Sequence, residues 1–544
     1  MRNLTKSLFL ITCICTFWVL AHISGCASIQ RPTGGPKDSL PPKILKENPK
    51  NFTTNFKGDE VEIDFDEYFK LTDEFKEISV SPAMEKSPNF KVKKKTLNIQ
   101  FNEPLLDSTT YTINFGKSIA DYNEGNKVKN YMYVLSTGNK IDSLQLSGTV
   151  LNTLTKKPVL DATVFILPVA QDSLFGKKRA SIFTTTDSSG VFKLKYLREG
   201  TYNIYALKEE GGDRIFNSAN ELIGFLNNPV KVTNDTTGNL SLELFKENPK
   251  IYKLLDRKIE KDGRITFISN KQLKNPGIEI LNPADLNATK VVEFSATKDT
   301  ALLWAPSMEF DSINVVLSDD KINIDTVVLR RNKKDTYNRL LTISDNIPGG
   351  KLKPGEDISL TLSAPIKYID GKKFSLLQDS VPVTGLRVSR DSLSTRKINI
   401  RYPWKDEKKY ILTIADDGFT GTFGGANKVY TKQFTKDIEE NYGVLTTKMT
   451  VPDTSKNYIV QLYNSQEKLV STKLIKKNTS LNFPTLGVGK YFVRIIYDAN
   501  KNGVWDTGNV RDKKQPEKVW NYSKEIGLRA NFDVEEAIAI PKDE

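Results

Sequence analysis

Several stretches of the chain alternate apolar and polar residues with a period of two, and this pattern constrains the fold more than any other feature. Residues 61–65, 97–101 and 398–402 each place β-branched, aliphatic or aromatic side chains at every second position. Such alternation gives an extended segment one apolar face, which is typical of a strand that covers a core on one side. Turn-forming residues separate these stretches, as in Asp-Ser-Ser-Gly at 187–190. We therefore predict an all-β chain of sandwiches, with one short helical turn within residues 69–78.

The chain also repeats itself. Residues 97–101 resemble residues 398–402, which begin 301 residues later. Residues 196–204 resemble residues 485–493, with Gly200 and Gly489 in equivalent positions 289 residues apart. Two separations of similar size indicate a doubled unit of two sandwiches. A further β region between them brings the expected total to about five sandwiches.

The first 26 residues have the parts of a secretory signal. Arg2 and Lys6 precede an apolar run at 8–21, which is too short for a comfortable membrane span. The Ile-Ser-Gly-Cys tetrapeptide that follows resembles the lipobox of bacterial lipoproteins, in which the thiol is diacylated before the peptidase cuts. We predict that residues 1–25 are removed and that Cys26 carries the lipid. The alternative is an ordinary signal peptide with a chance cysteine.

Removal of this leader would also remove two of the three cysteines and the histidine of the chain. The chain has three cysteines and one histidine, and Cys13, Cys15 and His22 all precede Cys26. The mature chain would therefore lack disulfides, free thiols and histidine. This excludes Ser-His-Asp and Cys-His catalysis, and zinc sites built from His or Cys. We predict that the protein is not an enzyme.

Two pairs of carboxylates are the remaining candidates for acid–base chemistry. Asp64 and Asp66 lie on one face of a predicted strand, and Asp416 and Asp417 precede Gly418. A solvent-facing strand and a turn explain these pairs better than catalysis does. The segment at 421–425, Gly-Thr-Phe-Gly-Gly, is interpreted as a flexible hairpin tip.

The net charge of +13 is spread along the chain, with lysines and acids interleaved. This distribution predicts a dispersed solvated surface. The alternative is attraction to anionic lipid headgroups or acidic partners. No motif indicates binding of nucleic acid.

The sharpest candidate site is a loop at residues 498–506 that matches the first nine positions of a calcium loop. Gly503 permits the sharp turn, and Asn509 stands where such loops carry a bidentate glutamate. We therefore predict weak calcium binding, near the millimolar range of extracellular modules. The alternative is a plain turn rich in Asn and Gly. The predicted ligands are the side chains of Asp498, Asn500, Asn502 and Asp506 and the backbone carbonyl of Val504.

The repeat supplies a second copy of this loop. Glu209 and Asp213 stand opposite Asp498 and Asn502, and Arg214 stands opposite Gly503. Some oxygens are kept and others lost, so we predict a degenerate loop that keeps its shape without the ligands.

Two sets of motifs resemble known families. The tether residues 34–38, Asp-Phe-Asp-Glu at 64–67 and Asn-Phe-Gly at 114–116 resemble Bacteroidota lipoproteins with an Ig-like domain of the SbsA type, over residues 26–137. Residues 146–150, together with the motifs near 158–164, 186–190 and 200–202, resemble the transthyretin-like fold of the carboxypeptidase regulatory domain. The second resemblance implies a small sandwich with a structural or binding role and no catalysis.

These observations predict seven segments. They are a signal peptide at 1–25, a lipidated tether rich in Pro and Gly at 26–42, an SbsA-type Ig-like domain at 43–140, a transthyretin-like sandwich at 141–245, a further β-sandwich at 246–345, a second Ig-like domain at 346–437, and a second transthyretin-like sandwich with the Asp/Asn loop at 438–544.

The anchor and the lack of catalytic groups suggest a function. We expect a structural and protein-interaction scaffold of the outer membrane, in its specific form an accessory subunit of a barrel-assembly or secretion complex. Its partners would be the membrane, through the lipid on Cys26, and other outer-membrane proteins. Surface-exported lipoproteins of the phylum carry acids after the cysteine, and residues 27–36 contain none, which favours the periplasmic face over the cell surface. The alternative function is a cell-surface adhesin or a glycan-binding lipoprotein. No cofactor is predicted besides calcium.

Overall fold

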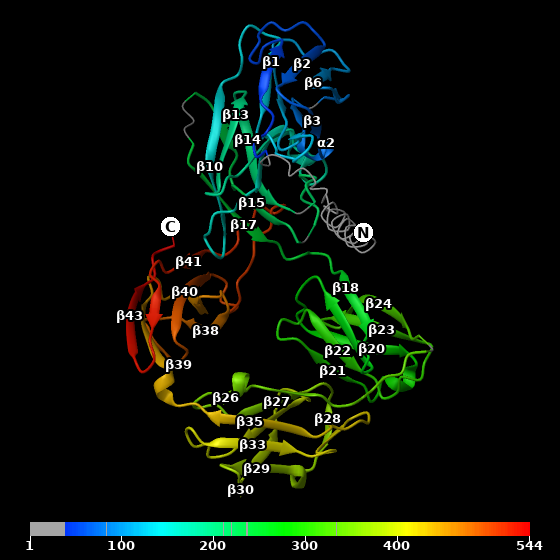
Figure 1. Cartoon of the computed structure of the whole chain (residues 1–544), viewed down its shortest axis with the longest axis vertical. Coiled ribbons are helices and arrows are strands. Elements are labelled where there is room, and N and C mark those ends of the chain that lie inside the picture. Colours follow the sequence, from blue (N-terminus) through cyan, green and yellow to red (C-terminus); the bar gives the residue numbers. More distant parts are fainter. Residues whose placement is uncertain are drawn as a thin grey trace, which may run out of the picture. The chain divides into compact units, whose positions relative to one another are not determined.

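The computed structural model describes residues 38–82, 84–209, 211–218, 220–234, 238–332 and 334–543 (Figure 1). The predicted signal peptide, Cys26 and most of the tether lie outside these residues. The described part is almost entirely β, which confirms the predicted fold class. The chain divides into two compact units, Met1–Ile141 and Asp142–Glu544. Each is described by itself below.

The first unit contains one sandwich, called the first sandwich. Its elements are β1 (Ile44–Asn48), β2 (Glu60–Phe65), β3 (Phe69–Leu71), α2 (Glu74–Glu77), β4 (Ser79–Ser81), β5 (Asn89–Lys93), β6 (Thr96–Gln100), β7 (Thr110–Asn114), β8 (Ile119–Asp121) and β9 (Met132–Ser136). The sheets have the orders β1-β2-β6-β5 and β4-β7-β9, and β3 pairs with β8. Val61 pairs with Ile99 and Ile63 with Leu97, and all four side chains are fully buried. The period-two pattern thus places one face of β2 and β6 in the core.

The second sandwich begins the second unit. Its elements are β10 (Leu144–Asn152), β11 (Thr163–Pro168), the 3₁₀ turn η1 (Val169–Leu174), β12 (Ile182–Thr185), β13 (Val191–Leu197), β14 (Gly200–Lys208), β15 (Leu222–Phe225), β16 (Val230–Val232) and β17 (Leu240–Lys246). The strand order is β12-β11-β14-β15-β17-β10-β13, and β16 pairs with β14. Parallel pairing of β10 with β17 lets these strands enclose one core, which includes Val164, Ile204 and Leu242.

The third sandwich follows directly. Its elements are β18 (Leu254–Ile259), β19 (Arg264–Ser269), β20 (Pro276–Asn282), η2 (Ala284–Leu286), β21 (Val291–Phe294), β22 (Thr300–Trp304), β23 (Ser312–Asp319) and β24 (Ile322–Arg330). Its sheets have the orders β18-β19-β22-β21 and β20-β23-β24. Ile265, Leu303 and Val315 lie fully buried between them.

The fourth sandwich has the strand plan of the first. Its elements are β25 (Ile343–Asp345), η3 (Pro348–Gly350), β26 (Lys351–Leu352), β27 (Ile358–Leu362), β28 (Ile366–Ile369), η4 (Gly371–Lys373), β29 (Phe374–Gln378), β30 (Val381–Val383), β31 (Arg387–Arg390), β32 (Lys397–Arg401), β33 (Lys409–Ile414), β34 (Phe419–Gly421) and β35 (Tyr430–Lys436). Its sheets have the orders β25-β27-β32-β31 and β26-β35-β33-β29-β30, and β28 pairs with β34. Strand by strand, β25-β27-β32-β31 corresponds to β1-β2-β6-β5, and β29-β33-β35 corresponds to β4-β7-β9.

The fifth sandwich follows η5 (Glu439–Asn441) and has the strand plan of the second. Its strands are β36 (Gly443–Thr450), β37 (Asn457–Asn464), β38 (Leu469–Ile475), β39 (Thr479–Leu486), β40 (Gly489–Asp498), β41 (Val519–Asn521), β42 (Ile526–Leu528) and β43 (Asp533–Ala539). The sheets have the orders β39-β36-β43 and β38-β37-β40-β41, with β42 on β40. The parallel β36–β43 pair stands where β10–β17 stands in the second sandwich.

Local contacts repeat along with the strand plan. The Tyr202 hydroxyl donates to the carbonyl of Arg198 at 2.9 Å, and the Tyr491 hydroxyl donates to the carbonyl of Gly487 at 2.7 Å. Each pair links residues four apart, and the two tyrosines are 289 residues apart. The second and fifth sandwiches therefore share this tyrosine–carbonyl hydrogen bond as well as a strand topology.

No helix within the described residues is long and apolar enough to cross a membrane.

Candidate functional site

The predicted calcium loop connects β40 to β41 and is organised by Asp498. This carboxylate is fully buried and accepts hydrogen bonds from the backbone amides of Asn502, at 3.0 Å, and Gly503, at 2.9 Å. Gly503 has a φ of 78°, in the left-handed region that glycine adopts without strain. The loop thus has the sharp turn that its sequence predicts.

The other predicted ligands gather on Asp506. Both side-chain amides, of Asn500 and of Asn502, donate to Asp506 Oδ2, and the second bond measures 2.9 Å. Asn502 Oδ1 accepts the backbone amide of Val504 at 2.9 Å. The structure therefore brings the predicted side chains together within one loop.

Glu517 belongs to the same loop and carries no signal in the sequence. Its Oε1 accepts the amide of Ala499 at 2.9 Å, and its Oε2 accepts the amide of Asp506 at 3.0 Å. Burial raises the pKa of Glu517, and the charges of Asp506 and Asp498 add to this rise, which outweighs the opposing hydrogen bonds from the two amides. Glu517 lies eleven residues beyond Asp506 in the chain, outside any calcium-loop spacing.

The donor set of this loop suits a hard cation in part. Carboxylate, amide and carbonyl oxygens are the ligands that calcium prefers. Within the described ranges, however, no three acidic side chains form a cluster that could hold a metal. A calcium ion would therefore depend on the oxygens of Asn500, Asn502 and the Val504 carbonyl as well as on carboxylates. Calcium binding stays a prediction.

The equivalent loop of the second sandwich has the same backbone turn with different residues. Glu209 accepts the amides of Asp213, at 3.2 Å, and Arg214, at 2.7 Å, which are the counterparts of the two amides held by Asp498. Arg214 has a φ of 59°, as its counterpart Gly503 has 78°. An acidic side chain that caps two amides is thus the shared feature of both loops, and it needs no ion.

The outer part of the same connection, residues 505–517, packs against the second sandwich. Val510 is 1% exposed and lies in an apolar cluster on the β12-β11-β14-β15 sheet. The aromatic members of this cluster from the second sandwich are Phe165, Phe183, Tyr205, Phe216, Phe225 and Phe245. Two segments about 300 residues apart therefore form one apolar core.

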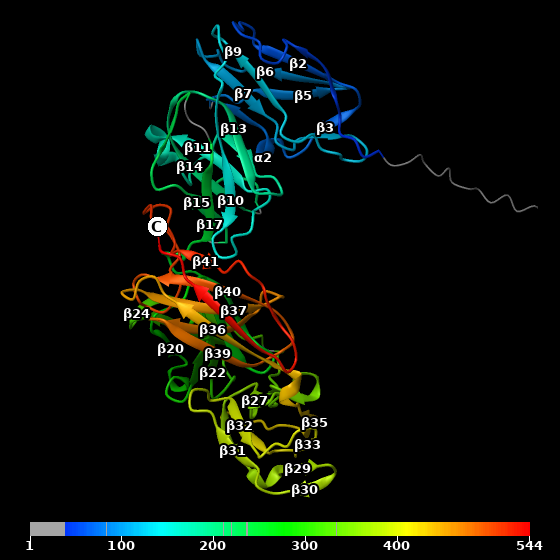
Figure 2. The ribbon, with the colours of Figure 1, turned by 90° about the vertical axis from the view of Figure 1, so that its left-hand side faces the viewer.

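Polar contacts surround this apolar contact. Lys513 donates to the Tyr205 hydroxyl at 2.5 Å, and Gln515 donates to the carbonyl of Phe225 at 2.8 Å. The side-chain amide of Asn521, in β41, donates to the carbonyl of Leu154 at 2.9 Å. Figures 1 and 2 both show β41 beside the end of the second sandwich where β10 and β17 lie. The fifth sandwich is thus docked on the second.

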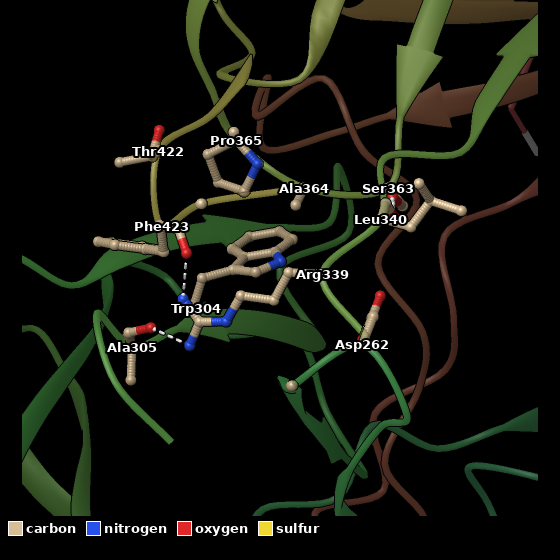
Figure 3. Close-up of a pocket in the computed structure, with 13 residues that line it drawn as sticks. Asp262, Trp304, Ala305, Arg339, Leu340, Ser363, Ala364, Pro365, Thr422 and Phe423 are labelled. Atoms are coloured by element: carbon tan, nitrogen blue, oxygen red, sulfur yellow. Dashed lines mark hydrogen bonds between the residues drawn. The ribbon is translucent and has the colours of Figure 1, made fainter. Parts of the chain in front are cut away.

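Another junction joins the third and fourth sandwiches around Arg339 (Figure 3). Its guanidinium donates to the carbonyls of Ala305, at 3.0 Å, and Pro306, at 3.2 Å, in the third sandwich. It also donates to the carbonyl of Phe423, in the fourth, at 2.8 Å. Burial lowers the pKa of Arg339. A small hollow of about 20 Å³ lies beside it, and its lining includes Asp262. The two terminal nitrogens of Arg339 thus link carbonyls of both sandwiches.

The glycine-rich segment at 421–425 belongs to this junction. Gly425 has a φ of 78°, and a Cβ atom there would lie 2.0 Å from the carbonyl oxygen of Arg339. Only glycine fits so close an approach of two backbones. Residues 421–425 form the hairpin tip that the sequence predicts, closed by the bond from the amide of Gly421 to the carbonyl of Gly425 at 2.9 Å. The tip packs against the chain at Arg339, a contact that no local pattern encodes.

Three of the four carboxylates in the two acid pairs, those of Asp64, Asp66 and Asp416, have structural partners. Asp64 accepts the hydroxyl of Thr96 at 2.5 Å, and Asp66 accepts the amide of Lys43 at 2.8 Å. Asp416 accepts the amide of Val429 at 2.8 Å. These carboxylates hold strands and turns together.

Comparison with known families places one part of the chain. Residues 38–137 match the model of a bacterial Ig-like domain. The first sandwich is a bacterial Ig-like domain. This confirms the prediction of such a domain in this part of the chain. The narrower SbsA type, the transthyretin-like assignments and the link to Bacteroidota stay predictions.

Solved structures align with much of this chain, but their TM-scores are low. The Bacillus anthracis TIE protein is 12% identical, over 93% of this chain and 76% of its own, with a TM-score of 0.15. BcpA, the major pilin subunit of Bacillus cereus, is 10% identical, over 73% and 99%, with a TM-score of 0.14. The S-layer protein rSbsC is 13% identical, over 89% and 67%, with a TM-score of 0.15. These chains do not superpose as wholes. No curated protein is similar in sequence to this chain.

The calcium prediction can be tested by thermal melting. At about ten times a millimolar Kd, calcium should stabilise the fifth sandwich by about 1.4 kcal/mol, which is a rise of a few degrees in its Tm. Asp506→Ala should abolish the rise, and Asp213→Ala, in the equivalent loop of the second sandwich, should keep it. A wild-type melting curve that is the same with calcium and with chelator would contradict the prediction.

Proposed function

We propose that this chain is a non-enzymatic, lipid-anchored scaffold of the outer membrane. Its Ig-like and related sandwiches would hold other outer-membrane proteins in place. The observation that carries the proposal is the docking of the fifth sandwich on the second through Val510, which is buried among aromatic side chains. Freely jointed sandwiches would not bury a side chain between them. A scaffold, in contrast, needs surfaces that keep fixed positions, and this contact supplies them.

The junction of the third and fourth sandwiches supports the same conclusion. Arg339 links carbonyls from both, and Glu293 of the third pairs with Arg396 of the fourth at 2.5 Å. The exposed fractions of these two paired side chains are 16% and 19%. Contacts between domains of one chain are ordinarily small and polar, and they permit motion. Buried contacts at two junctions restrict that motion within the second unit.

The sequence supports the proposed attachment to the membrane. The lipobox-like tetrapeptide supports a diacylated Cys26, and the residues after it contain no acid, which supports the periplasmic face. A lipid-anchored protein on that face can reach the periplasmic ends of membrane barrels. The specific proposal is an accessory subunit of a complex that assembles barrels or secretes proteins.

Purification of the tagged protein in mild detergent tests this function. The wild-type protein should bring down a β-barrel partner in fixed stoichiometry. Cys26→Ala should remove the lipid and shift the protein from the membrane fraction to the soluble fraction, so the same partner should be lost or strongly reduced. A wild-type protein that purifies alone would contradict the scaffold.

The adhesin alternative makes a different prediction for whole cells. A surface adhesin would be cut when protease is added to intact cells, whereas a periplasmic scaffold would survive until the outer membrane is opened.

A further inference from the structure

A hollow of about 200 Å³ lies on the outer face of the β38-β37-β40-β41 sheet of the fifth sandwich. It is smaller than the sites of drug-sized ligands, which measure about 300–1,000 Å³, so it suits a small ligand. The same sheet face continues to the contact with Leu154 of the second sandwich, where Ile459, Ile496 and Val519 are buried. The docked second sandwich thus covers one part of this face and leaves the hollow beside it.

Two aromatic side chains of the outer sheet face line the hollow. Tyr463 and Phe492 are directly opposite each other on β37 and β40. Tyr522, which also borders the hollow, packs on the core side, where its hydroxyl donates to Glu536 at 2.6 Å. Phe492 is 39% exposed, although most phenylalanines of this chain lie in cores. Tyr463 is held in place because its hydroxyl donates to Gln461 at 2.9 Å. The exposed ring of Phe492 is suited to contact with a flat apolar group.

Arg494, in β40, lines the same hollow. Its Nη1 donates to the Tyr463 hydroxyl at 2.8 Å, and its Nε donates to Asn521 Oδ1 at 3.3 Å. The guanidinium carbon lies 4.4 Å from the centre of the Tyr463 ring. Among the described residues, none accepts a hydrogen bond from Nη2, and no carboxylate forms an ion pair with Arg494. Neutral partners thus orient the guanidinium of Arg494, and its Nη2 group remains available to a ligand.

The charges at the rim do not neutralise Arg494. Lys157, from the second sandwich, pairs with Glu467, from the β37–β38 turn, at 2.5 Å. Both side chains are more than half exposed, so this pair cancels within itself and is weak. Lys157, Glu467 and Arg494 together therefore give the hollow one net positive charge. Burial lowers the pKa of Arg494 and outweighs the opposing effects of the Tyr463 hydroxyl and the nearby Glu467 carboxylate.

We propose that this hollow binds a carboxylate that carries an aromatic ring beside it. The carboxylate would accept hydrogen bonds from Arg494, and the ring would lie against Phe492. Charge-assisted bonds to a partly desolvated guanidinium are among the stronger ones in proteins. Two sources share this chemistry, a free aromatic acid and the C-terminal aromatic residue of a peptide. The inference stands apart from the scaffold function, because it uses neither the lipid nor an outer-membrane partner.

Saturation-transfer NMR with N-acetylphenylalanine tests the proposal on the full mature chain. The acid should bind, and N-acetylphenylalaninamide, which lacks the carboxylate, should bind at least about tenfold more weakly. Arg494→Gln should lower the affinity for the acid by a similar factor. Arg387→Gln is the matched control, because Arg387 is exposed on β31 of the fourth sandwich. The peptide N-acetyl-Ala-Ala-Phe distinguishes the sources: tighter binding than the single residue assigns a peptide end, and weaker binding assigns a free acid.

Two further variants separate recognition from folding. Phe492→Ala removes one wall and should weaken binding of the acid a few-fold while the preference for the acid over the amide remains. Arg494→Lys keeps the charge without the planar fork, so its affinity should fall between wild type and Arg494→Gln. Circular dichroism melting should be unchanged in all of them. Equal binding of acid and amide, wild-type affinity in Arg494→Gln, absence of binding by the acid, or equal binding of glucuronic acid would each overturn the proposal.

Discussion

Replacing Val510 with aspartate is expected to release the fifth sandwich from the second without unfolding either one. Burial of a valine side chain contributes about 1.5–3 kcal/mol, and an unpaired carboxylate at the same place costs several kcal/mol more. The backbone amide of Val510 donates to Glu247, so the new charge would also face an existing one. Hydrogen exchange should show faster exchange at residues 505–517 and at β11, β14 and β15, whereas the cores of both sandwiches stay protected.

Val504→Asp is the matched control for this substitution. Val504 lies in the same connection, only six residues away, but it is 54% exposed where Val510 is 1% exposed. In the presence of chelator, which removes the predicted calcium contact of the Val504 carbonyl, a charge at Val504 should leave exchange and melting as in wild type. If Val510→Asp behaved like Val504→Asp, the docking would not be a stable feature of the protein, and the scaffold would lose its main support.

The strands could be predicted from the sequence. Residues 61–65 and 97–101 alternate because each strand has one face in a core, and the structure has β2 and β6 there. Residues 398–402 gave the same signal and form most of β32. Turns were equally clear, since Gly190 and Gly503 adopt the positive φ that their positions predict. These features depend on neighbours in the chain, so a local pattern records them.

The contacts between sandwiches were not predictable in the same way. Val510 stands in the sequence Gly-Asn-Val-Arg-Asp-Lys, which has the composition of a surface loop, and nothing near it signals an aromatic partner. The pair of Glu293 and Arg396 links residues 103 apart in different sandwiches. Each partner by itself resembles the many exposed charges of the chain. Such contacts depend on how whole domains meet, and a single sequence does not record that.

The candidate loop falls between these two cases. Asp498, Asn500, Asn502 and Asp506 could be found from their spacing alone. Glu517 could not, because it reaches the loop from the far end of a long connection. The repeated loop shows a second role for such a residue. Glu209 caps two backbone amides in the second sandwich, at the positions equivalent to the two amides that Asp498 caps in the fifth. A ligand-like residue in a repeated loop can therefore be kept for the turn itself.

Glu293→Ala is expected to weaken the junction of the third and fourth sandwiches more than any surface change would. The Glu293 carboxylate accepts Arg396 Nε at 2.5 Å and the Ser394 hydroxyl at 2.7 Å. Arg396 also lies over the Trp304 ring, with its guanidinium carbon 5.4 Å from the ring centre. Removing the carboxylate leaves a mostly buried cation without its partner, which costs about 3–5 kcal/mol for a fully buried pair and about 2–4 kcal/mol at this exposure. Urea unfolding followed by tryptophan fluorescence should show an earlier transition.

Acid should have the same effect on the wild-type junction. Burial raises the pKa of Glu293, but hydrogen bonds from Ser394 and Arg396 and the charge of Arg396 outweigh it and hold the pKa below its ordinary value of 4.5. The pair therefore stabilises the junction fully above the unfolded-state pKa, and this contribution is lost as the pH falls through the lower folded-state value. The difference between wild type and Glu293→Ala should accordingly shrink in acid. Glu309→Ala is the control, because Glu309 is 83% exposed in its pair with Arg331 and should cost less than about 1 kcal/mol. Equal shifts for both variants at neutral pH would mean that the Glu293–Arg396 pair does not hold the two sandwiches together.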